Sequence, residues 1–435
     1  MLVEIHMIQN HSPSNVNRDD LGAPKTSVFG STLRGRISSQ CLKRSIRRSQ
    51  HFREPLHKYL GIRTKFLPDL VRNALKNSQE IPTEDGAGIV KRITEVAEAE
   101  KGGAAPELEA DDRPRTAQLI FLGPEEAAGL VRALVDLRNH KKWGPKYRKF
   151  VEGKLKGKDL VGFHRELRAA YAKRSIDVSM FGRMTTSDAF EDVEAAMEVA
   201  HAISTHEVRN EVDYFTAVDD LSTGTGAGHV DENQFNSACY YKYFSLDWDM
   251  LVSNLAGPAP AEEERKRDPE GTERWEQRRL EATQLAGRAL GHFLRAAALT
   301  VPSGKKKGHA NNNLPDGILV EVKKEHIPTS YGNAFADAVK PTEQRGLVAE
   351  SIARLGHYVG CVVKGYGIDS SRLWFSPQGH RLEYMPLSDG DGQEEKPVVM
   401  ADQVVPSLDQ LIAGTLKRVG VDWEEVKKAD GEEEE

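Results

Sequence analysis

Two segments that both look like strands of one β-sheet lie far apart in this chain. Residues 2–8, LVEIHMI, alternate side chains in the manner of a strand buried on at least one face. FNSACYYKYFSLDW, residues 235–248, is the clearest strand because it is rich in aromatic residues. Between them, residues 54–173 carry many charges, with apolar residues at helical spacing. This order predicts an α+β fold whose sheet is assembled from distant segments.

One short segment combines a helical pattern with unusual charge. RISSQCLKRSIRRS, residues 36–49, places Leu42 and Ile46 on one side of a helix. From Arg34 to Arg53 there are seven Lys or Arg and no Asp or Glu. A serine-rich helix start flanked by cations can hold phosphate groups, although a charged run is more often only a solvated surface. The phosphate-binding hypothesis assigns a nucleic-acid backbone to five residues, Ser38, Gln40, Lys43, Arg44 and Arg47.

The composition limits the classes of protein that remain. The chain has 435 residues and a net charge of −6, which argues against indiscriminate nucleic-acid binding. Its three cysteines, Cys41, Cys239 and Cys361, form no CxxC pair, so neither a zinc site nor a disulfide framework is indicated. We expect no cofactor and no metal. The N-terminus lacks the basic start of a signal peptide, and no apolar run approaches the roughly 20 residues of a membrane span, so we expect a cytoplasmic protein.

Further basic and aromatic groups leave two interpretations open. The island from Arg138 to Lys149 contains six Lys or Arg and no acid, and a solvated helix face is as good an interpretation as a nucleic-acid contact. The cluster from Lys305 to Lys307 is ambiguous in the same way. Tyr214 and Phe215 adjoin a polar, glycine-rich stretch. Aromatic rings are usually buried, but exposed ones could stack on bases, with about 1–3 kcal/mol for each stacked base.

Asp19 and Asp20 raise the possibility of metal-dependent RNA cleavage. Paired carboxylates can hold a divalent metal ion. However, Asn-Arg-Asp-Asp in a loop commonly forms Asx turns and a salt bridge, and the spacing places no third ligand or base. The turn is therefore the favoured interpretation.

Several motifs in succession resemble one known family. They are HSPSNVNRDD, RISSQCLKRSIRRS, GRMTTSD, AHAISTHEV and DYFTAVDDL, with VKGYGIDSSRLWFSP and VPSLDQL near the end. Their order is similar to that of the CasC family, the backbone subunits of the type I-E CRISPR surveillance complex, Cascade. The resemblance covers nearly the whole chain. Singly, none of these motifs would be specific.

The resemblance implies a hand-like fold with a modified ferredoxin-like (RRM-like) palm, a helical fingers insertion and an extended thumb. We assign 1–53 to the first part of the palm, 54–173 to the fingers and 174–190 to a palm strand. Residues 191–235 would form the thumb, 236–423 the remaining palm with a web, and 424–435 a disordered acidic tail.

The resemblance also implies roles for particular residues. RNA contacts on the palm would come from Arg18, Lys25, Ser38, Gln40, Lys43, Arg44 and Arg47. A wedge or thumb contact would come from Arg183, Met184, Phe215 and Thr216. The fingers would guide target DNA with Lys141, Lys142 and Lys146, although Pro145 interrupts that island.

The leading hypothesis is a non-catalytic subunit that binds CRISPR RNA and forms a helical filament along it. Its partners would be CRISPR RNA, target DNA, further copies of itself, and the large, small and guide-end-capping subunits of Cascade. Backbone contacts read no sequence, which suits a guide whose sequence varies. The alternatives are a metal-dependent endoribonuclease using Asp19 and Asp20, and a stand-alone RNA-binding module.

Overall fold

The computed structural model divides the chain into two compact units. It describes residues 1–78, 80–98, 115–116, 119–123, 126–169, 175–184, 192–217, 229–257, 259–386 and 396–432. Unit 1 comprises Met1–Pro55, Glu198–Trp248 and Gly287–Glu435, and unit 2 comprises Leu56–Met197 and Asp249–Ala286. In the described residues, no helix combines the length and the apolar character needed to cross a bilayer.

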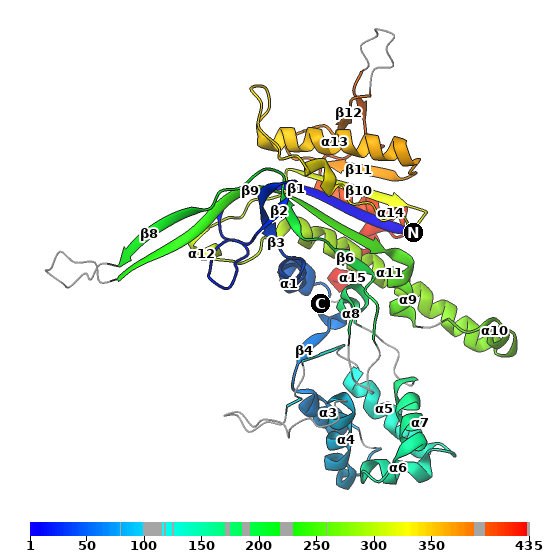
Figure 1. The fold of residues 1–435 in the computed structure, drawn as a ribbon. Helices are drawn as coiled ribbons and strands as arrows, with labels where there is room; N and C mark the ends of the chain where they lie inside the picture. The colour runs from blue at the N-terminus through cyan, green and yellow to red at the C-terminus, as the bar shows by residue number, and fades with distance from the viewer. Residues whose placement is uncertain are drawn as a thin grey trace. The chain divides into compact units, whose positions relative to one another are not determined.

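Unit 1 contains the large sheet and the helices that cover it (Figure 1). Its strands are β1 (Leu2–Ser14), β2 (Thr26–Phe29), β3 (Thr32–Ile37), β7 (Ala202–Ser204), β8 (Glu211–Ala217), β9 (His229–Asp247), β10 (Gly317–Lys323), β11 (Ser371–Phe375), β12 (Glu383–Tyr384), β13 (Val398–Val399) and β14 (Gln403–Val404). Its helices are α1 (Ser39–Arg48), α2 (Gln50–Arg53), α12 (Lys306–His309), η3 (Gly332–Phe335), α13 (Leu347–Tyr366), α14 (Leu408–Arg418) and α15 (Trp423–Glu432).

The sheet is built from distant segments, as the sequence predicted. Its order is β14-β11-β10-β1-β9-β7-β3-β2, and β8 pairs with the outer part of β9. β1 is antiparallel to β9, where Leu2 faces Asp247, and to β10, where Leu2 faces Lys323. The mixed α/β architecture with one large sheet is therefore confirmed.

The central strand β1 is buried on both faces, because helices cover both sides of the sheet. On one face, Ile8 shares an apolar cluster with residues of α13, including Leu355. On the other face, Phe244 packs edge-to-face against Phe293 of α11 (Pro269–Leu299), at 5.4 Å between ring centroids. A strand covered on both sides reads as a nearly continuous apolar run, which is why residues 2–8 predicted it so clearly.

Lys242 is a buried cation on the β9 face that carries Phe244. It is 1% exposed, and its ammonium group donates a hydrogen bond to the side-chain oxygen of Gln9. Burial lowers the pKa of Lys242 to about 8. The folded state therefore binds this proton less well than the unfolded state, so Lys242 opposes folding at neutral pH, and this cost shrinks as the pH rises.

We expect the Lys242→Met substitution to remove the cost of burying this charge, which offsets the loss of the hydrogen bond to Gln9. The free energy of unfolding of the variant, relative to that of the native chain, should be most favourable near pH 7. This difference should shrink by roughly 2 kcal/mol by pH 9.5, because the native lysine then loses its proton. Hydrogen exchange of β1 and β9 amides against urea, at both pH values, measures this difference. A difference that stays constant with pH would contradict the buried charge.

Unit 2 is mainly helical. Its elements are η1 (His57–Tyr59), β4 (Ile62–Thr64), α3 (Leu67–Lys76), η2 (Thr83–Asp85), α4 (Gly86–Glu98), β5 (Ile120–Leu122), α5 (Glu126–Asn139), α6 (Gly144–Val151), α7 (Gly157–Ala169), α8 (Ile176–Phe181) and α10 (Glu262–Arg267). β6 (Met197–Val199), α9 (Trp248–Ala256) and α11 extend across the unit boundaries. Helices α3 to α7 enclose an apolar core that includes Val71, Ile89 and Leu134. The predicted helical character of 54–173 is thus confirmed for the described residues.

The strand predicted within 174–190 is wrong in its described part. Residues Ile176–Phe181 form helix α8, and 185–190 lie outside the described residues. Ile176 and Val178 alternate with polar residues as in a strand, but Asp177 and Ser179 are buried as well. The Asp177 carboxylate accepts a hydrogen bond of 2.6 Å from the backbone N–H of Gly61.

The prediction of a disordered acidic tail over 424–435 is also wrong for most of that segment. Helix α15 extends to Glu432. The Asp430 carboxylate accepts hydrogen bonds from Arg288, at 2.6 Å, and lies 2.8 Å from the His292 ring nitrogen. These contacts with Arg288 and His292 hold a segment that its acidic composition alone assigned to disorder. The exact boundaries of palm, thumb and web remain predictions.

Candidate nucleic-acid interface

Helix α1 forms where the sequence predicted it. The Ser38 hydroxyl accepts the Cys41 backbone N–H at 3.3 Å, which caps the helix. Leu42 and Ile46 are each 3% exposed, and burial of each contributes about 1.5–3 kcal/mol. Because one side is fixed against the sheet, the opposite side presents Arg44 and Arg48 to solvent.

A groove runs beside this exposed side of α1. Its volume is about 790 Å³, and all of its lining belongs to unit 1. One side is α1, and the others are the loop after β1 and the segment that follows α11. The lining residues are Val16, Asn17, Arg18, Asp19, Asp20, Gly22, Cys41, Arg44, Ser45, Arg48, Ser49, Thr300, Val301, Ser303 and Gly304. We call this cavity the α1 groove.

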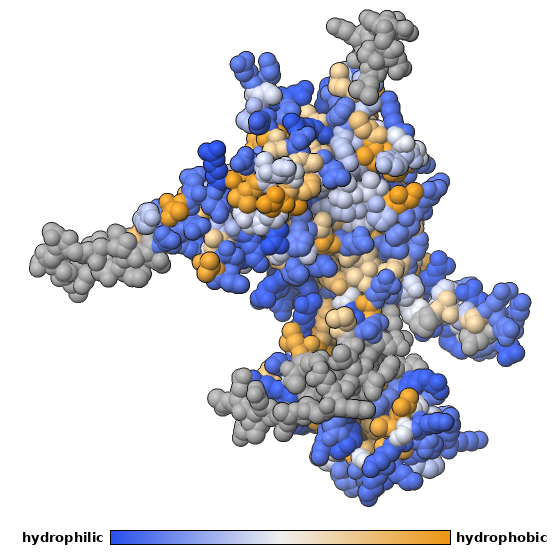
Figure 2. Space-filling model, in the orientation of Figure 1, coloured by the Kyte–Doolittle hydropathy of each residue, from blue (hydrophilic) through white to orange (hydrophobic). Residues whose placement is uncertain are grey.

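The cations of the α1 groove are available to an anionic ligand. Arg18, Arg44 and Arg48 are exposed, and no carboxylate of the described residues forms an ion pair with them. Figure 2 shows hydrophilic residues over much of the visible surface around α1. Three arginines and three serine hydroxyls along one groove suit a chain of phosphates, which need charge and hydrogen-bond donors but no base-specific contact.

Asp19 supports the wall of the groove as a turn residue. Its carboxylate oxygen Oδ1 accepts the backbone N–H groups of Leu21 and Ala23, each at 2.9 Å. This confirms the predicted Asx turn. The loop holds Arg18 beside the groove, and Arg18 also forms a backbone bridge with Pro24.

A lysine cluster lies next to the groove in the fold, which the sequence did not indicate. Gly304 is packed so closely that a Cβ atom there would lie 2.5 Å from the carbonyl oxygens of Asn15 and Val16. Lys305 follows in the left-handed conformation, with φ of 43°, and directly precedes the one-turn helix α12. The tight contact therefore places Lys305, Lys306 and Lys307 beside the loop that lines the groove.

The other predicted palm residues are distributed along α1 and its approach. Arg18 and Arg44 line the α1 groove, whereas Lys25, Ser38, Gln40, Lys43 and Arg47 do not. Lys43 and Arg47 are half-buried, and both have partners within the structure. Gln40 is exposed at the first turn, and Ser38 is occupied by its capping bond. Arg48, which sequence reasoning left out, is better placed than Arg47.

The predicted thumb is a two-stranded hairpin that extends from the sheet (Figure 1). Glu211–Ala217 of β8 pairs with His229–Phe235 of β9, and residues 218–228 lie outside the described residues. Tyr214 is 70% exposed and Phe215 is 40% exposed, so the expectation that such rings are buried is wrong here. Thr216 pairs with Val230 through the backbone. The exposed rings of Tyr214 and Phe215 can therefore contact a ligand in solution.

Unit 2 holds the remaining predicted site residues. Met184 is 95% exposed, but Arg183 is 7% exposed and donates a hydrogen bond of 2.8 Å to Glu126. The Arg183 guanidinium is thus occupied in this structure. Of the predicted finger lysines, Lys141 and Lys142 are exposed, and Lys146 pairs with Asp159 at 2.6 Å. The Nζ atoms of Lys142 and Lys146 lie 4.6 and 5.0 Å from the Trp143 ring centroid, within the range of a cation–π interaction.

One group of side chains in the described residues has the spacing of a metal site. It consists of Glu4, His6 and Glu321, all fully buried. Protein cations already neutralise its carboxylates: Lys323 pairs with Glu4, and Arg372 with Glu321 at 2.7 Å. We call these five residues the buried charge network. Its balance of two acids and two cations explains its burial without a metal ion.

Comparisons of the sequence and of the structure with known proteins identify the family of this chain. The sequence model of the CT1975-like protein family matches residues 3–396. No curated protein matches the chain. A solved chain of a "CRISPR RNA-guided surveillance complex, pre-nicking" shares 25% identity and a TM-score of 0.68, over 96% of this chain and 100% of that one. A chain of a "CRISPR RNA-guided surveillance complex" has 22% identity and a TM-score of 0.59 over the same shares, which supports the fold. Because the family match spans most of its length, the chain belongs to the CT1975-like protein family.

Proposed function

We propose that this protein is a backbone subunit of a CRISPR RNA-guided surveillance complex and that its α1 groove holds the guide RNA backbone. The observation that carries this proposal is the α1 groove itself, where Arg18, Arg44 and Arg48 face solvent without carboxylate partners in the described structure. The full-length similarity to a chain of such a complex supports it. The net charge of −6 disfavours stray binding, and the local cations provide affinity for the guide.

Finer features of the proposal rest on the sequence motifs. The chain would act without catalysis, in the cytoplasm, as part of a type I-E complex, with copies arranged in a filament along one RNA. The central strands of the sheet would form the RRM-like palm. Lys25, Ser38, Gln40, Lys43 and Arg47 would extend the RNA contact beyond the groove, and Arg183, Met184, Phe215 and Thr216 would act near the thumb. Lys141, Lys142 and Lys146 would contact target DNA.

Purification of the chain with a co-expressed CRISPR RNA and the other subunits tests the central claim. We expect RNA of uniform length in the particle, sensitive to ribonuclease, and several copies of this chain for each RNA. Native mass spectrometry measures both quantities. A particle free of RNA, or one copy per RNA without neighbour contacts, would contradict the proposal and favour a stand-alone binding module.

The endoribonuclease alternative has less support. The Asp19 carboxylate is engaged by two backbone N–H groups, and the metal-like group of the described residues lies elsewhere, at Glu4, His6 and Glu321. We expect no cleavage when the purified protein is incubated with RNA and Mg²⁺. Cleavage that disappears in Asp19→Asn and Asp20→Asn variants would instead establish the enzyme.

Phe215→Ala should separate guide binding from target pairing. The ring is exposed on the hairpin, so its removal should leave folding and RNA content unchanged. Loss of one stacked or wedged base contact should weaken binding of complementary DNA by roughly 5- to 150-fold, corresponding to about 1–3 kcal/mol. Filter binding with complementary DNA measures this. Val212→Ala, on the same strand and also exposed, is the control.

A further inference from the structure

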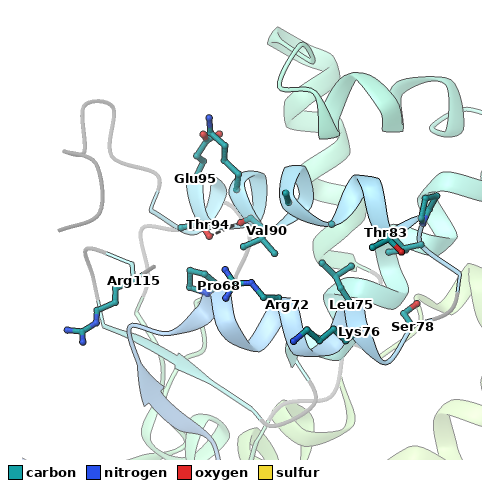
Figure 3. Close-up of a pocket in the computed structure, with 15 residues that line it drawn as sticks. Pro68, Arg72, Leu75, Lys76, Ser78, Thr83, Val90, Thr94, Glu95 and Arg115 are labelled. Atoms are coloured by element: carbon teal, nitrogen blue, oxygen red, sulfur yellow. Dashed lines mark hydrogen bonds between the residues drawn. The ribbon is translucent and has the colours of Figure 1, made fainter. Parts of the chain in front are cut away.

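An apolar groove in unit 2 has no role in the proposed RNA scaffold. It lies between α3 and α4 and has a volume of about 810 Å³ (Figure 3). Its floor consists of aliphatic side chains, Pro68, Leu75, Ile81, Ala87 and Val90. Figure 3 shows Leu75 and Val90 pointing into the space between the two helices. We call this cavity the α3–α4 groove.

The apolar floor continues the stripes that build the core of unit 2. Val71 of α3 and Ile89 of α4 are fully buried in that core. Leu75, one turn after Val71, and Val90, next to Ile89, are only partly buried. Among the described residues, each helix thus carries its apolar side beyond the region that its neighbours cover. This partly exposed apolar surface favours a partner that brings aliphatic side chains.

The rim of the α3–α4 groove is cationic. Four cations line it, Arg72, Lys76, Lys91 and Arg115, against one carboxylate, Glu95, and Arg72 is already paired with Asp69 at 2.6 Å. Glu95 is already paired with Arg92. Lys76 and Lys91 are exposed, one on each helix, and have no carboxylate partner among the described residues. The chain has a net negative charge, so this local excess of positive side chains favours binding of an acidic ligand.

A nucleic acid fits this surface poorly. None of the described residues that line the groove has an aromatic ring, so bases would lack the aromatic side chains on which they usually stack. A phosphate chain would also leave the aliphatic floor unfilled. We infer that the α3–α4 groove binds an amphipathic, acidic peptide segment of another subunit, with aliphatic side chains on the floor and Asp or Glu near Lys76 and Lys91. This is the helix-in-groove mode of peptide recognition.

A photo-crosslinker in place of Leu75, in the purified native complex, tests the inference. We expect a crosslink to a different polypeptide, at a segment with aliphatic residues flanked by at least two Asp or Glu, identified by mass spectrometry. The same group in place of Val161, which is 70% exposed on α7, should not give this crosslink. A crosslink to nucleic acid, to residues of the same chain, or to nothing would overturn the inference.

Charge reversal provides a second, independent readout. Lys76→Glu with Lys91→Glu should reduce the crosslink yield roughly tenfold, by repulsion of the acidic segment. Lys149→Glu with Lys158→Glu, both exposed elsewhere in unit 2, makes the same charge change and should leave the yield unaltered. Equal crosslink yields in the two double variants would show that the partner segment is not held by acidic side chains. RNA content is measured in the same samples, so a particle without RNA counts against the scaffold function and not against this groove.

Discussion

Replacing Arg44 and Arg48 together by Glu is expected to remove guide RNA from the protein. Both side chains are exposed on α1 and line the α1 groove, so their reversal leaves Leu42 and Ile46 in place and the helix intact. Each lost charged contact costs about 1.5–3 kcal/mol, so RNA affinity should fall at least roughly 100-fold. With two fewer phosphates neutralised, the log–log salt slope should weaken by about 1.4. Fluorescence anisotropy with a labelled guide measures both.

The matched control is Lys324→Glu with Lys417→Glu. These lysines are exposed in unit 1, do not line the α1 groove, and make the same change in net charge. If binding falls equally in both pairs, general charge attracts the RNA and the α1 groove has no special role. If affinity and salt slope survive the Arg44 and Arg48 reversal, these arginines are only a solvated surface.

Glu321→Gln is expected to produce the largest loss of stability. Glu321 is fully buried, and its carboxylate accepts hydrogen bonds from Arg372 at 2.7 Å, Ser370 at 2.9 Å and Tyr331 at 2.8 Å. The substitution keeps the shape but leaves Arg372 buried without its counter-ion, which typically costs about 3–5 kcal/mol. Hydrogen exchange of β10 and β11 amides in the full-length chain measures the change. Glu325→Gln, an exposed acid just beyond β10, should change stability by less than about 0.5 kcal/mol.

The same variant should alter the dependence of stability on pH. Burial alone would raise the pKa of Glu321, but hydrogen bonding to His6 and the charges of Arg372 and Lys323 lower it well below its ordinary value of 4.5. Its stabilisation is therefore complete above pH 4.5 and is lost as the pH falls. The gap between native chain and variant should narrow by about 2 kcal/mol from pH 6 to pH 3. A gap that does not narrow as the pH falls would show that the fold does not lower the pKa of Glu321.

Local patterns predicted the elements whose burial matches their sequence pattern. α1 has one apolar side and one charged side, so its position and its cap could be predicted from residues 36–49. α8 is buried on every side, so its sequence lacks amphipathic periodicity, and the strand prediction failed. The order of α15 depends on Arg288 and His292, more than 100 residues away, which no local pattern reveals.

The sequence predicted a cationic site on α1, but it did not predict which residues form that site. The run of cations identified α1, whereas the exposure of Tyr214 and Phe215 stayed ambiguous in the sequence, because such rings are more often buried. Arg48 is exposed and lines the α1 groove, whereas Arg47 is half-buried and does not, and this difference follows from how α1 packs in the folded protein. Lys305 joins the site only because Gly304 fits closely against Asn15 and Val16, a tertiary contact between distant segments. The buried charge network left no sequence signal, since Glu4 and Glu321 are separated by most of the chain.

The central position of β1 has a consequence for synthesis. Leu2 is synthesised well before its partners Asp247 and Lys323, which follow it by more than 240 residues. At about 5–20 residues per second, the apolar first strand waits on the order of tens of seconds for its neighbours. During that interval its two edges can pair with any other exposed strand, including those of sister chains on the same messenger. Nascent-chain protection by chaperones, rather than the stability of the finished fold, would then limit how much of this protein a cell can accumulate.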